Sequence, residues 1–423
     1  MLLVQKYGGT SVGTPERIRA VAARVARARR RGDDVVVVVS AMGDSTDELI
    51  ALAEQVAEGD PTSRHPREMD MLLTAGERIS MALLAMAIRG EGADARSLTG
   101  SQAAIITDTH HTAARIREVR ADRVRAVVDD GCVAIVAGFQ GVSTEREITT
   151  LGRGGSDTTA VALACALGAD RCEIYTDVDG IYTADPRRVA GARIIPVITH
   201  EEMLELASAG AQVMHPRAVD IALRYGVDLR VLSSFGDDDD PERGTLITRP
   251  EKMKELEELA VTGITSAPGY ARLLLRGLPA GMDTPTALLG ALADAGVSVD
   301  TVQEAPDADG RILLQLTVTD DRLPTALETA RRVAGELGGG AVEERSGLTR
   351  ITLVGRGMTG RPGVYARAYR ALSDAGVAVE GVSTSSISIT LLVAADAGDA
   401  AQEALHAGFG LEVARGAALA AAG

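Results

Sequence analysis

Two glycine-rich segments carry the charged residues that could do chemistry in this chain. Lys6 stands just before Gly8-Gly9. Arg153 and Asp157 flank Gly154-Gly155-Ser156. Glycines let backbone N–H groups converge on an anion, and a helix that begins there adds its positive N-terminal end. Phosphoryl transfer needs cations and dipoles around the transferred group and little covalent chemistry, so the two segments together favour a phosphoryl-transfer site.

Each of these charges also has a plainer interpretation. Lys6 could be an ordinary lysine at the end of a strand, and Asp157 a first-turn carboxylate that stabilises its helix by about 0.3 kcal/mol or more. Lys6 is, however, one of only three lysines among 44 basic residues, the others being Lys252 and Lys254. A compact ammonium fits a tight phosphate pocket better than a forked guanidinium, which favours the phosphate interpretation. Neither glycine segment has the GxxxxGK(S/T) spacing of a P-loop or the strand-GxGxxG-helix pattern of a dinucleotide site.

A third polar segment, residues 176–187, follows a strand predicted at 172–176. Ligands bind at the carboxyl ends of strands in open α/β sheets, so this turn is a candidate ligand contact. The Asp-x-Asp-Gly run from Asp177 to Gly180 also occurs in calcium loops. Here the acceptor at the twelfth position is missing and no pair of EF-hand helices flanks the loop, which disfavours calcium. No metal site made of protein side chains is predicted.

The composition of the 423 residues excludes several classes of protein. Lys+Arg is 44 and Asp+Glu is 59, and a net charge of −15 repels a phosphate backbone, so nucleic acid is not an expected partner. We find no apolar run of the roughly 18 to 20 residues that cross a bilayer and no secretory leader at the start, so we expect a cytoplasmic protein with no membrane partner. The three cysteines have no CxxC spacing, which disfavours disulfides and a zinc site.

The spacing of apolar residues predicts alternating strands and helices through residues 1–248. Five consecutive valines, 35–39, are too short and too β-branched for a helix, and they are apolar on both faces as a central parallel strand must be. Thr14 is a natural N-cap, and Pro15 is typical of the first helical position. Strands are expected at 2–5, 35–39, 132–138, 172–176 and 227–232, with a flexible connector at 8–13 and helices at 15–31, 69–88, 156–167, 201–209 and 216–225. This alternation predicts one α/β domain with a largely parallel sheet.

An internal repeat follows a charged connector. Residues 291–302 match residues 371–382 at eight of twelve positions, with an offset of 80 residues. Around each copy we expect a strand, a helix ending at a glycine, and two further strands, which together make a small α+β module. Two tandem modules behind an enzyme-like domain indicate regulation, although a duplicated dimerisation unit without a ligand would give the same pattern.

Five segments resemble the signature segments of the aspartate kinases, which belong to the amino acid kinase family. They follow one another in the expected order through nearly the whole first domain, and the repeated tail resembles the tandem ACT domains of that family. The segments are 6–12, 40–47, 73–80, 149–158 and 176–187. The resemblance implies an α/β, amino acid kinase-like three-layer domain with a largely parallel central sheet, followed by two α+β ACT (ferredoxin-like) modules. The implied boundaries are a catalytic domain at 1–248, a linker at 249–262, and ACT domains at 263–342 and 343–423.

The activity that the resemblance implies is the ATP-dependent phosphorylation of the β-carboxylate of L-aspartate to 4-phospho-L-aspartate, with Mg²⁺. This is the first step toward lysine, threonine, methionine and isoleucine. The substrate carboxylate is already a nucleophile at neutral pH, because its pKa as a free group is about 4, so no general base is required. Two alternatives stay open: an enzyme of the same fold that acts on an aspartate analogue in specialised metabolism, and a non-catalytic amino-acid-sensing subunit.

The resemblance also assigns roles to individual residues. Lys6 and Asp157 are implied to be catalytic, with Lys6 contacting the transferred phosphoryl group and Asp157 orienting Lys6. Glu77 is implied to hold the substrate ammonium and Arg153 to grip its α-carboxylate, for which a bidentate guanidinium is suited. The implied phosphate-binding residues are Lys6, Gly8, Gly9, Gly154, Gly155 and Ser156; the aspartate-binding residues are Ser40, Thr46, Glu77, Arg153 and Ser156; and the nucleotide-binding residues are Tyr175, Thr176, Asp177, Tyr182, Arg187 and Gln212.

Several positions depart from the pattern of that family. Gln212 stands where the family commonly has a lysine near the nucleotide phosphates, which removes one cation. In the first ACT module Ala280-Gly281-Met282-Asp283 replaces an Asp-Lys-Pro-Gly loop and Glu304-Ala305 replaces a Gln-Asn pair; in the second, Ser385-Ser386-Ile387-Ser388 replaces Ser-Glu-Ile-Arg. An amino-acid effector pocket needs paired charges and a converging glycine turn, so we expect weakened or absent feedback by lysine and threonine. A homo-oligomer is expected, because ACT modules usually pair through their sheets.

Overall fold

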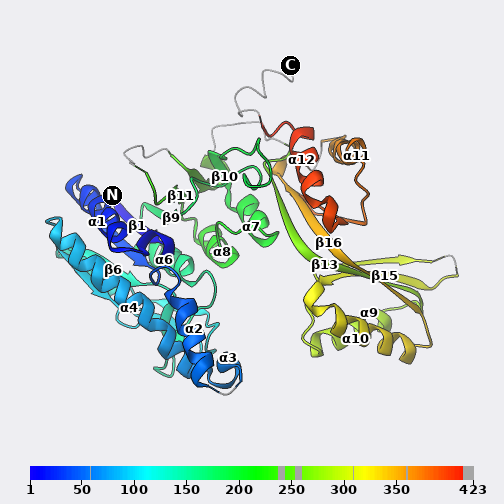
Figure 1. Ribbon diagram of the computed structural model, residues 1–423, viewed down its shortest axis with the longest axis horizontal. Helices are drawn as coiled ribbons and strands as arrows, with labels where there is room; N and C mark the ends of the chain where they lie inside the picture. Colours follow the sequence, from blue (N-terminus) through cyan, green and yellow to red (C-terminus); the bar gives the residue numbers. More distant parts are fainter. Residues whose placement is uncertain (58, 237–242, 253–259, 308, 359–360, 413–423) are drawn as a thin grey trace. The chain divides into compact units, whose positions relative to one another are not determined.

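The computed structural model describes residues 1–423 with the exception of 58, 237–242, 253–259, 308, 359–360 and 413–423. The chain divides into two compact units (Figure 1). The first unit is Met1–Tyr182 with Ile194–Leu256, and the second is Thr183–Arg193 with Glu257–Gly423. The segment Thr183–Arg193 therefore leaves the first unit and joins the second. The predicted boundary at residue 248 assigned this segment to the first domain.

An eight-stranded sheet forms the centre of the first unit, in the order β10-β12-β11-β9-β1-β2-β6-β3. Its neighbouring strands are parallel except for the pair β11 and β12, so the largely parallel sheet expected from the sequence is confirmed. The strands are β1 (Leu2–Tyr7), β2 (Asp34–Val39), β3 (Ala95–Leu98), β6 (Val133–Ala137), β9 (Arg171–Thr176), β10 (Val197–Thr199), β11 (Leu229–Ser233) and β12 (Thr245–Thr248).

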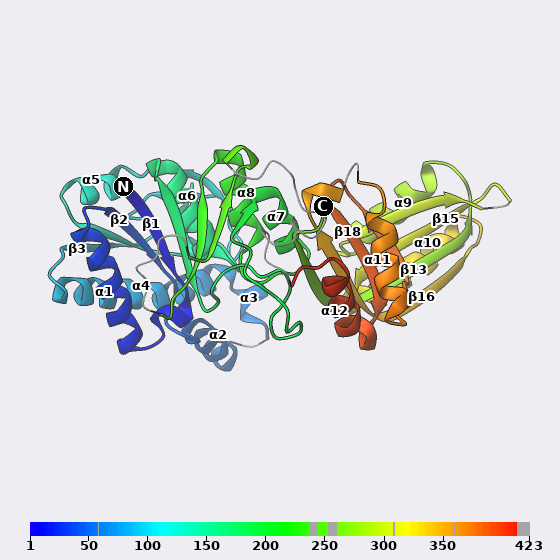
Figure 2. The same ribbon diagram turned by 90° about the horizontal axis from the view of Figure 1, so that it is seen from above.

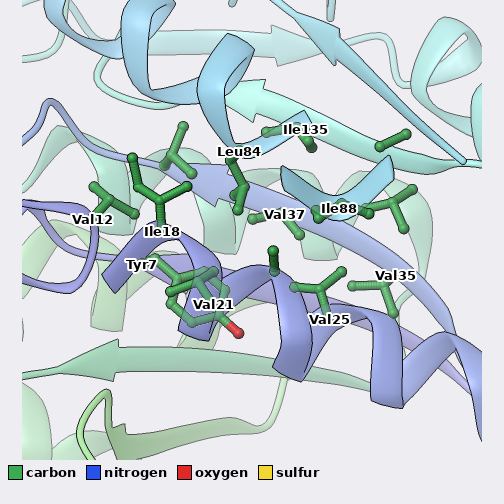
Figure 3. Close-up of a cluster of buried hydrophobic side chains, with 14 of the residues drawn as sticks. Tyr7, Val12, Ile18, Val21, Val25, Val35, Val37, Leu84, Ile88 and Ile135 are labelled. Atoms are coloured by element: carbon green, nitrogen blue, oxygen red, sulfur yellow. The ribbon is translucent and has the colours of Figure 1, made fainter. Parts of the chain in front are cut away.

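Helices cover both faces of this sheet, which gives the three layers expected of an amino acid kinase-like domain. α1 (Pro15–Arg30) and α4 (Pro66–Gly90) lie side by side, and their apolar side chains meet Val35, Val37 and Ile135 of the sheet (Figure 3). Val36 and Val38 are just as buried, because α6 (Gly155–Leu167) packs against β1, β2 and β9. Each fully buried valine contributes roughly 1.5–3 kcal/mol, so the five-valine strand anchors the centre of the sheet.

The local signals around the first helix act as the sequence predicts. The side-chain oxygen of Thr14 accepts the backbone N–H of Arg17 at 3.3 Å, and Pro15 occupies the first helical position. The helix ends before Gly32, whose φ of +89° suits glycine. The predicted flexible connector at residues 8–13 is corrected, because Gly9–Val12 forms a 3₁₀ turn in which the N–H of Ser11 donates to the carbonyl of Gly8 at 2.9 Å.

Several elements of the first unit have no counterpart in the sequence analysis. They include a second sheet in the order β5-β4-β7-β8, whose strands of three or four residues are too short to show a periodic pattern. The elements are α2 (Ser45–Val56), α3 (Pro61–Arg64), β4 (Ile105–Thr107), β5 (Ile116–Val119), α5 (Asp122–Asp129), β7 (Gln140–Ser143) and β8 (Ile148–Thr150). The predicted helices near 201–209 and 216–225 are present as α7 (His200–Ser208) and α8 (Pro216–Tyr225).

Helix α4 corrects the expectation that no stretch of the chain has the length and hydropathy of a membrane span. Within the described residues it alone meets that test, by length and composition only. Half of its most apolar window is buried inside the unit, where Leu84 and Ile88 join the core shown in Figure 3. It also carries the buried carboxyl groups of Asp70 and Glu77. Placing a carboxylate inside a membrane is energetically unfavourable, so these features are typical of the core helix of a globular unit.

The second unit contains the two α+β modules that the internal repeat predicts. A six-stranded antiparallel sheet has the order β14-β15-β13-β16-β18-β17. Figures 1 and 2 show the helices α9 and α10 side by side, and α11 and α12 likewise. The elements are β13 (Gly263–Leu278), α9 (Asp283–Asp294), β14 (Thr301–Pro306), β15 (Ile312–Thr319), α10 (Leu323–Glu336), β16 (Ala341–Val354), α11 (Val364–Asp374), β17 (Gly381–Thr384), β18 (Ser388–Ala394) and α12 (Gly398–Gly408).

The two modules share the long strands β13 and β16. Residues 263–268 pair with residues 349–354, whereas the rest of β13 pairs with β15 and with the beginning of β16. The apolar cores divide in the same way, because Val261 and Ile264 pack with residues 351–411 and not with the first module. The predicted division between residues 342 and 343 therefore lies inside the continuous strand β16. Residues 253–259 of the predicted linker lie outside the described residues.

Candidate active site

A cleft of about 1010 Å³ opens in the first unit, where β1 and β2 end. The neighbours of β1 are β2 on one side and β9 on the other, so the chain order reverses beside it, as at the ligand-binding crevices of open α/β sheets. The volume is at the upper end of the range for small-molecule sites, roughly 300–1,000 Å³. Of the predicted site residues, the cleft is lined by Lys6, Gly9, Ser40, Thr46, Glu77, Arg153, Gly154, Gly155, Ser156, Asp157 and Gln212.

An ion pair joins the two glycine-rich segments inside this cleft. The Nζ of Lys6, near the end of β1, lies 2.7 Å from the Oδ1 of Asp157 in the first turn of α6. Both side chains are only 12% exposed, so the pair is largely shielded from water. Gly8 lies beside the same ammonium, since a Cβ added to it would stand 3.4 Å from the Nζ of Lys6. The cation is therefore held in one position, close to two turns rich in backbone amides.

The turn at the start of α6 depends on glycine for its shape. Gly154 caps the helix with φ +68° and ψ +11°, a left-handed conformation that other residues adopt with strain. A side chain on Gly154 would overlap the ring of His215, and one on Gly155 would crowd Phe139. The positive end of the α6 dipole thus faces the cleft without side chains in front of it, an arrangement that suits an anion.

A half-free carboxylate and a guanidinium without a partner among the described residues line the same cleft. Glu77, on α4, is 3% exposed, and its Oε1 accepts the backbone N–H of Ala41 at 3.2 Å. Its Oε2 has no hydrogen-bond partner among the described residues. Burial raises the pKa of Glu77 to about 7. Arg153 is exposed and forms no hydrogen bond or ion pair with any residue that the structure describes. The two groups suit the ammonium and the carboxylate of an amino acid.

Most of the residues predicted to bind nucleotide do not line the cleft. Tyr175 is buried in the core, where its ring stacks on Tyr7 at 4.7 Å and its hydroxyl donates to Glu173 at 3.1 Å, because this position of β9 points toward α1. Its backbone carbonyl accepts the N–H of Gly8 at 3.3 Å. Thr176 ends β9, and Asp177 and Tyr182 follow it; none of these three described residues lines the cleft. Arg187 belongs to the second unit, where it pairs with Asp185 at 2.9 Å.

The structure adds cleft residues that the sequence analysis did not single out. Thr112 and Thr150 line the cleft, and the buried carboxylate of Asp70 accepts from both, from the backbone N–H of Thr112 at 3.0 Å and from the hydroxyl of Thr150 at 2.5 Å. His111 also contacts this carboxylate at 2.5 Å. Thr150 stands in a signature segment and could have been found there, whereas Thr112 lies in the turn between the unpredicted strands β4 and β5. The remaining additions include Asp47, Thr62, Phe139, Gly152, Met214 and His215.

Comparisons with known proteins agree on one family over nearly the whole chain. Residues 1–233 match the amino acid kinase family, and residues 351–409 match an ACT domain. An aspartokinase from Mycolicibacterium smegmatis is 46% identical over 413 residues, which is 97% of this chain and 96% of that protein.

Solved structures give the same result. E. coli aspartokinase III in complex with aspartate and ADP, in the R-state, has a TM-score of 0.77 at 25% identity and covers 96% of this chain and 99% of that one. The same enzyme with lysine and aspartate, in the T-state, has a TM-score of 0.72 at 26% identity, with coverage of 97% and 99%. This chain therefore belongs to the aspartokinases of the amino acid kinase family, which phosphorylate aspartate with ATP.

Proposed function

We propose that the cleft of the first unit binds L-aspartate beside ATP and transfers the γ-phosphoryl group to the β-carboxylate, producing 4-phospho-L-aspartate and ADP. The observation that carries this proposal is the 2.7 Å pair between Lys6 and Asp157 in a cleft that also contains Arg153 and Glu77. A cation fixed at the meeting point of two glycine turns supplies the stabilisation that phosphoryl transfer requires.

Aspartate is oriented by Glu77 and Arg153, each of which has polar atoms left without a partner among the described residues. The free Oε2 of Glu77 accepts from the α-ammonium, and the guanidinium of Arg153 takes the α-carboxylate in a bidentate contact. Ser40, Thr46 and Ser156 supply further polar contacts. With both α-substituents bound, the β-carboxylate is the part of the substrate that is left to react.

The transfer step needs positioning more than acid–base chemistry. An oxygen of the β-carboxylate forms a bond to the γ-phosphorus, the bond from that phosphorus to the bridging β,γ-oxygen breaks, and ADP leaves with the electron pair. Lys6 contacts the group in transfer, and the backbone amides of Gly9, Gly154 and Ser156 surround it. The N–H groups of Gly8 and Gly155 donate instead to the carbonyls of Tyr175 and Gly152. Asp157 acts as a positioning residue, because its carboxylate holds the ammonium of Lys6 in place.

The nucleotide and its metal are further parts of the proposal. Thr176, Asp177 and Tyr182 are proposed to hold the nucleoside, with the backbone of Tyr175 behind them. Gln212 lines the cleft and offers an amide to the phosphates at the position where the family resemblance implies a lysine. Mg²⁺ would accompany ATP and neutralise its β- and γ-oxygens. The described residues contain no group of three or more metal-binding side chains, which is compatible with an ion that binds mostly to water and substrate phosphates.

Trapping the acyl phosphate with hydroxylamine tests this function. Purified chain with ATP, Mg²⁺ and L-aspartate should form the hydroxamate, and a Lys6→Ala variant should not. Glutamate and aspartate analogues in parallel reactions separate the proposal from an enzyme of specialised metabolism. Hydroxamate from aspartate no greater than that of the variant would reject the proposal, and binding of aspartate without turnover would favour a sensing subunit.

Feedback by lysine and threonine is proposed to be weak or absent. E. coli aspartokinase III binds lysine in its T-state structure. In this chain Ala280 and Met282 stand in the loop before α9, and Ser386 and Ser388 stand near the turn before β18. None of these side chains can pair with the ammonium or the carboxylate of an amino acid effector as a charged residue would. Strong inhibition by lysine plus threonine below 1 mM, roughly the upper bound for a specific effector, would contradict this.

Assembly is proposed to occur through the second unit, in a cytoplasmic homo-oligomer. The strands β14 and β17 end the six-stranded sheet, and end strands of this kind can pair with another copy. Light scattering of the purified chain measures the mass directly, and a proline at Val302, the second residue of β14, should lower it. A monomeric wild-type chain at micromolar concentration would reject this part of the proposal.

A further inference from the structure

His215 stands at the junction of the cleft wall and a helix, and neither the family signatures nor the proposed reaction gives it a role. It is the N-cap of α8, and its Nδ1 accepts the backbone N–H of Arg217 at 3.3 Å. The same residue lines the cleft. Its other ring nitrogen, Nε2, makes no hydrogen bond with any residue that the structure describes.

The cap contact determines which nitrogen carries the proton. Nδ1 can accept an N–H only when it is itself unprotonated, so the neutral ring carries its hydrogen on Nε2. A ring turned the other way would present a carbon to the N–H of Arg217 and leave that group without an acceptor. Burial, reinforced by the guanidinium of Arg217, lowers the pKa of His215, although Asp157 acts in the opposite direction. The imidazole at neutral pH is therefore an uncharged donor.

The position of the ring places this donor beside the anion-binding turn of α6. The Cδ2 edge of His215, which is bonded to Nε2, packs against Gly154, since a side chain on that glycine would overlap it. Helices α6 and α8 pack on each other, and the residues that begin both helices line the cleft. The electrostatic influence of Asp157 on the ring also puts His215 near the Lys6–Asp157 pair.

We propose that the Nε2–H of His215 donates a hydrogen bond to the γ-phosphoryl group bound at the Gly154 turn. This inference deepens the proposed function and rests on it, since it takes a transferring phosphoryl group to be the ligand of that turn. A neutral donor adds no charge to Lys6 and the helix dipoles. The hydrogen bond from Nε2 strengthens as negative charge builds on the phosphoryl oxygens during transfer, so it affects the rate more than the binding of aspartate.

Two near-isosteric substitutions separate this role from the helix cap. His215→Asn keeps an acceptor at the position of Nδ1 and removes the donor at Nε2, whereas His215→Gln keeps a donor at the reach of Nε2 and loses the cap acceptor. We expect His215→Asn to keep its Tm within about 2 °C of wild type and to lose roughly 10- to 100-fold in kcat, with KM for aspartate changed by less than about threefold. We expect His215→Gln to lower Tm by about 4 °C and to keep most of kcat.

A binding measurement without turnover completes the test. By calorimetry, His215→Asn should bind the non-hydrolysable analogue AMP-PNP roughly tenfold more weakly than wild type and should bind ADP, which has no γ-phosphoryl group, equally well. Equal affinity for AMP-PNP, or the reverse pattern in which His215→Gln is the impaired variant, would overturn the inference. The outcome is separate from the proposed function, which falls only if the wild-type chain forms no hydroxamate from aspartate.

Discussion

The charged residues of the cleft differ from those between the two ACT modules in what they contact. In the cleft, Arg153 has no partner in the described part of the chain, and one oxygen of the buried Glu77 is likewise free. In the second unit, Arg350 pairs with Asp300 at 2.6 Å and Arg272 pairs with Glu380 at 3.4 Å. The first arrangement leaves charge for a ligand, and the second uses charge to hold two modules together.

The pairs of the second unit follow from the internal repeat. Asp300 and Glu380 occupy the same position of the two copies, just before β14 and β17, and each meets an arginine on the shared strands β13 and β16. Each module thus supplies one arginine and one carboxylate. A cavity between β14 and β17, lined by Asp300, Gln303 and Val382 among others, has a volume of about 10 Å³, room for about one water molecule, so the contact between the modules is nearly closed there. Because the charged residues of this interface already pair with one another, the interface is consistent with the weak effector response proposed above.

The largest expected effect comes from the fixed cation of the cleft. Lys6→Ala should lower kcat/KM by roughly 1,000-fold, because it removes the charge that stabilises the transferred group. Initial rates from the hydroxamate reaction measure this, and Lys6→Arg serves as the charge-matched control, which should also fail because a guanidinium does not fit the tight turn. Activity of Lys6→Ala within tenfold of wild type would remove the distinction between the two regions.

Arg153 should show the next largest effect, and on binding alone. Arg153→Ala is expected to raise KM for aspartate by roughly 100-fold, since a bidentate contact with a carboxylate is lost. Its thermal stability should match wild type, because no described residue depends on the guanidinium. Arg123→Ala, an exposed arginine on α5, is the matched control with unchanged KM. A large loss of stability in Arg153→Ala would show that its charge is structural.

The opposite pattern is expected for Arg350. Its side chain is 9% exposed, and Arg350→Ala leaves the carboxylate of Asp300 without its close partner, so the free energy of unfolding in urea should fall by about 2 kcal/mol. The rate of the uninhibited reaction should stay within about twofold. Arg331→Ala, which removes an exposed pair to Glu344 at 3.8 Å, should change stability by less than about 0.5 kcal/mol. Equal effects of the two variants would contradict the structural role of the Arg350 pair.

The smallest expected effect is a pH dependence of aspartate binding. Glu77 has a raised pKa of about 7, and only its ionised form can pair with the substrate ammonium. Protonation below that value therefore weakens binding, so KM for aspartate should fall about fivefold from pH 6 to pH 7 and level off above pH 8. Glu77→Gln should bind weakly at every pH and lose this slope. A profile of Glu77→Gln parallel to wild type would assign the titration to another group.

The two regions also differ in how far the sequence predicted them. Around the cleft, Lys6, Arg153 and Asp157 stand in glycine turns whose local chemistry is visible in the residues themselves, and the structure gathers all three on one wall. Thr112 could not be predicted, because it lies in a turn between two very short strands, β4 and β5. Tyr175 was assigned to the nucleotide although β9 turns its side chain into the core. Successive side chains of a strand point to opposite faces of the sheet, and the residues of the signature segment do not reveal which of the two faces is buried.

The amino-acid sequence alone was sufficient to predict the parallel α/β unit, the repeated modules and the two glycine turns with their charged residues. These features depend on neighbouring residues: β-branched runs, helix caps and glycines at turns. Only the tertiary structure decided that β13 and β16 serve both modules, that Glu77 keeps one oxygen free, and that the ring of His215 rests on Gly154. These features depend on residues far apart in the chain, and their geometry follows from which strand or helix packs beside which.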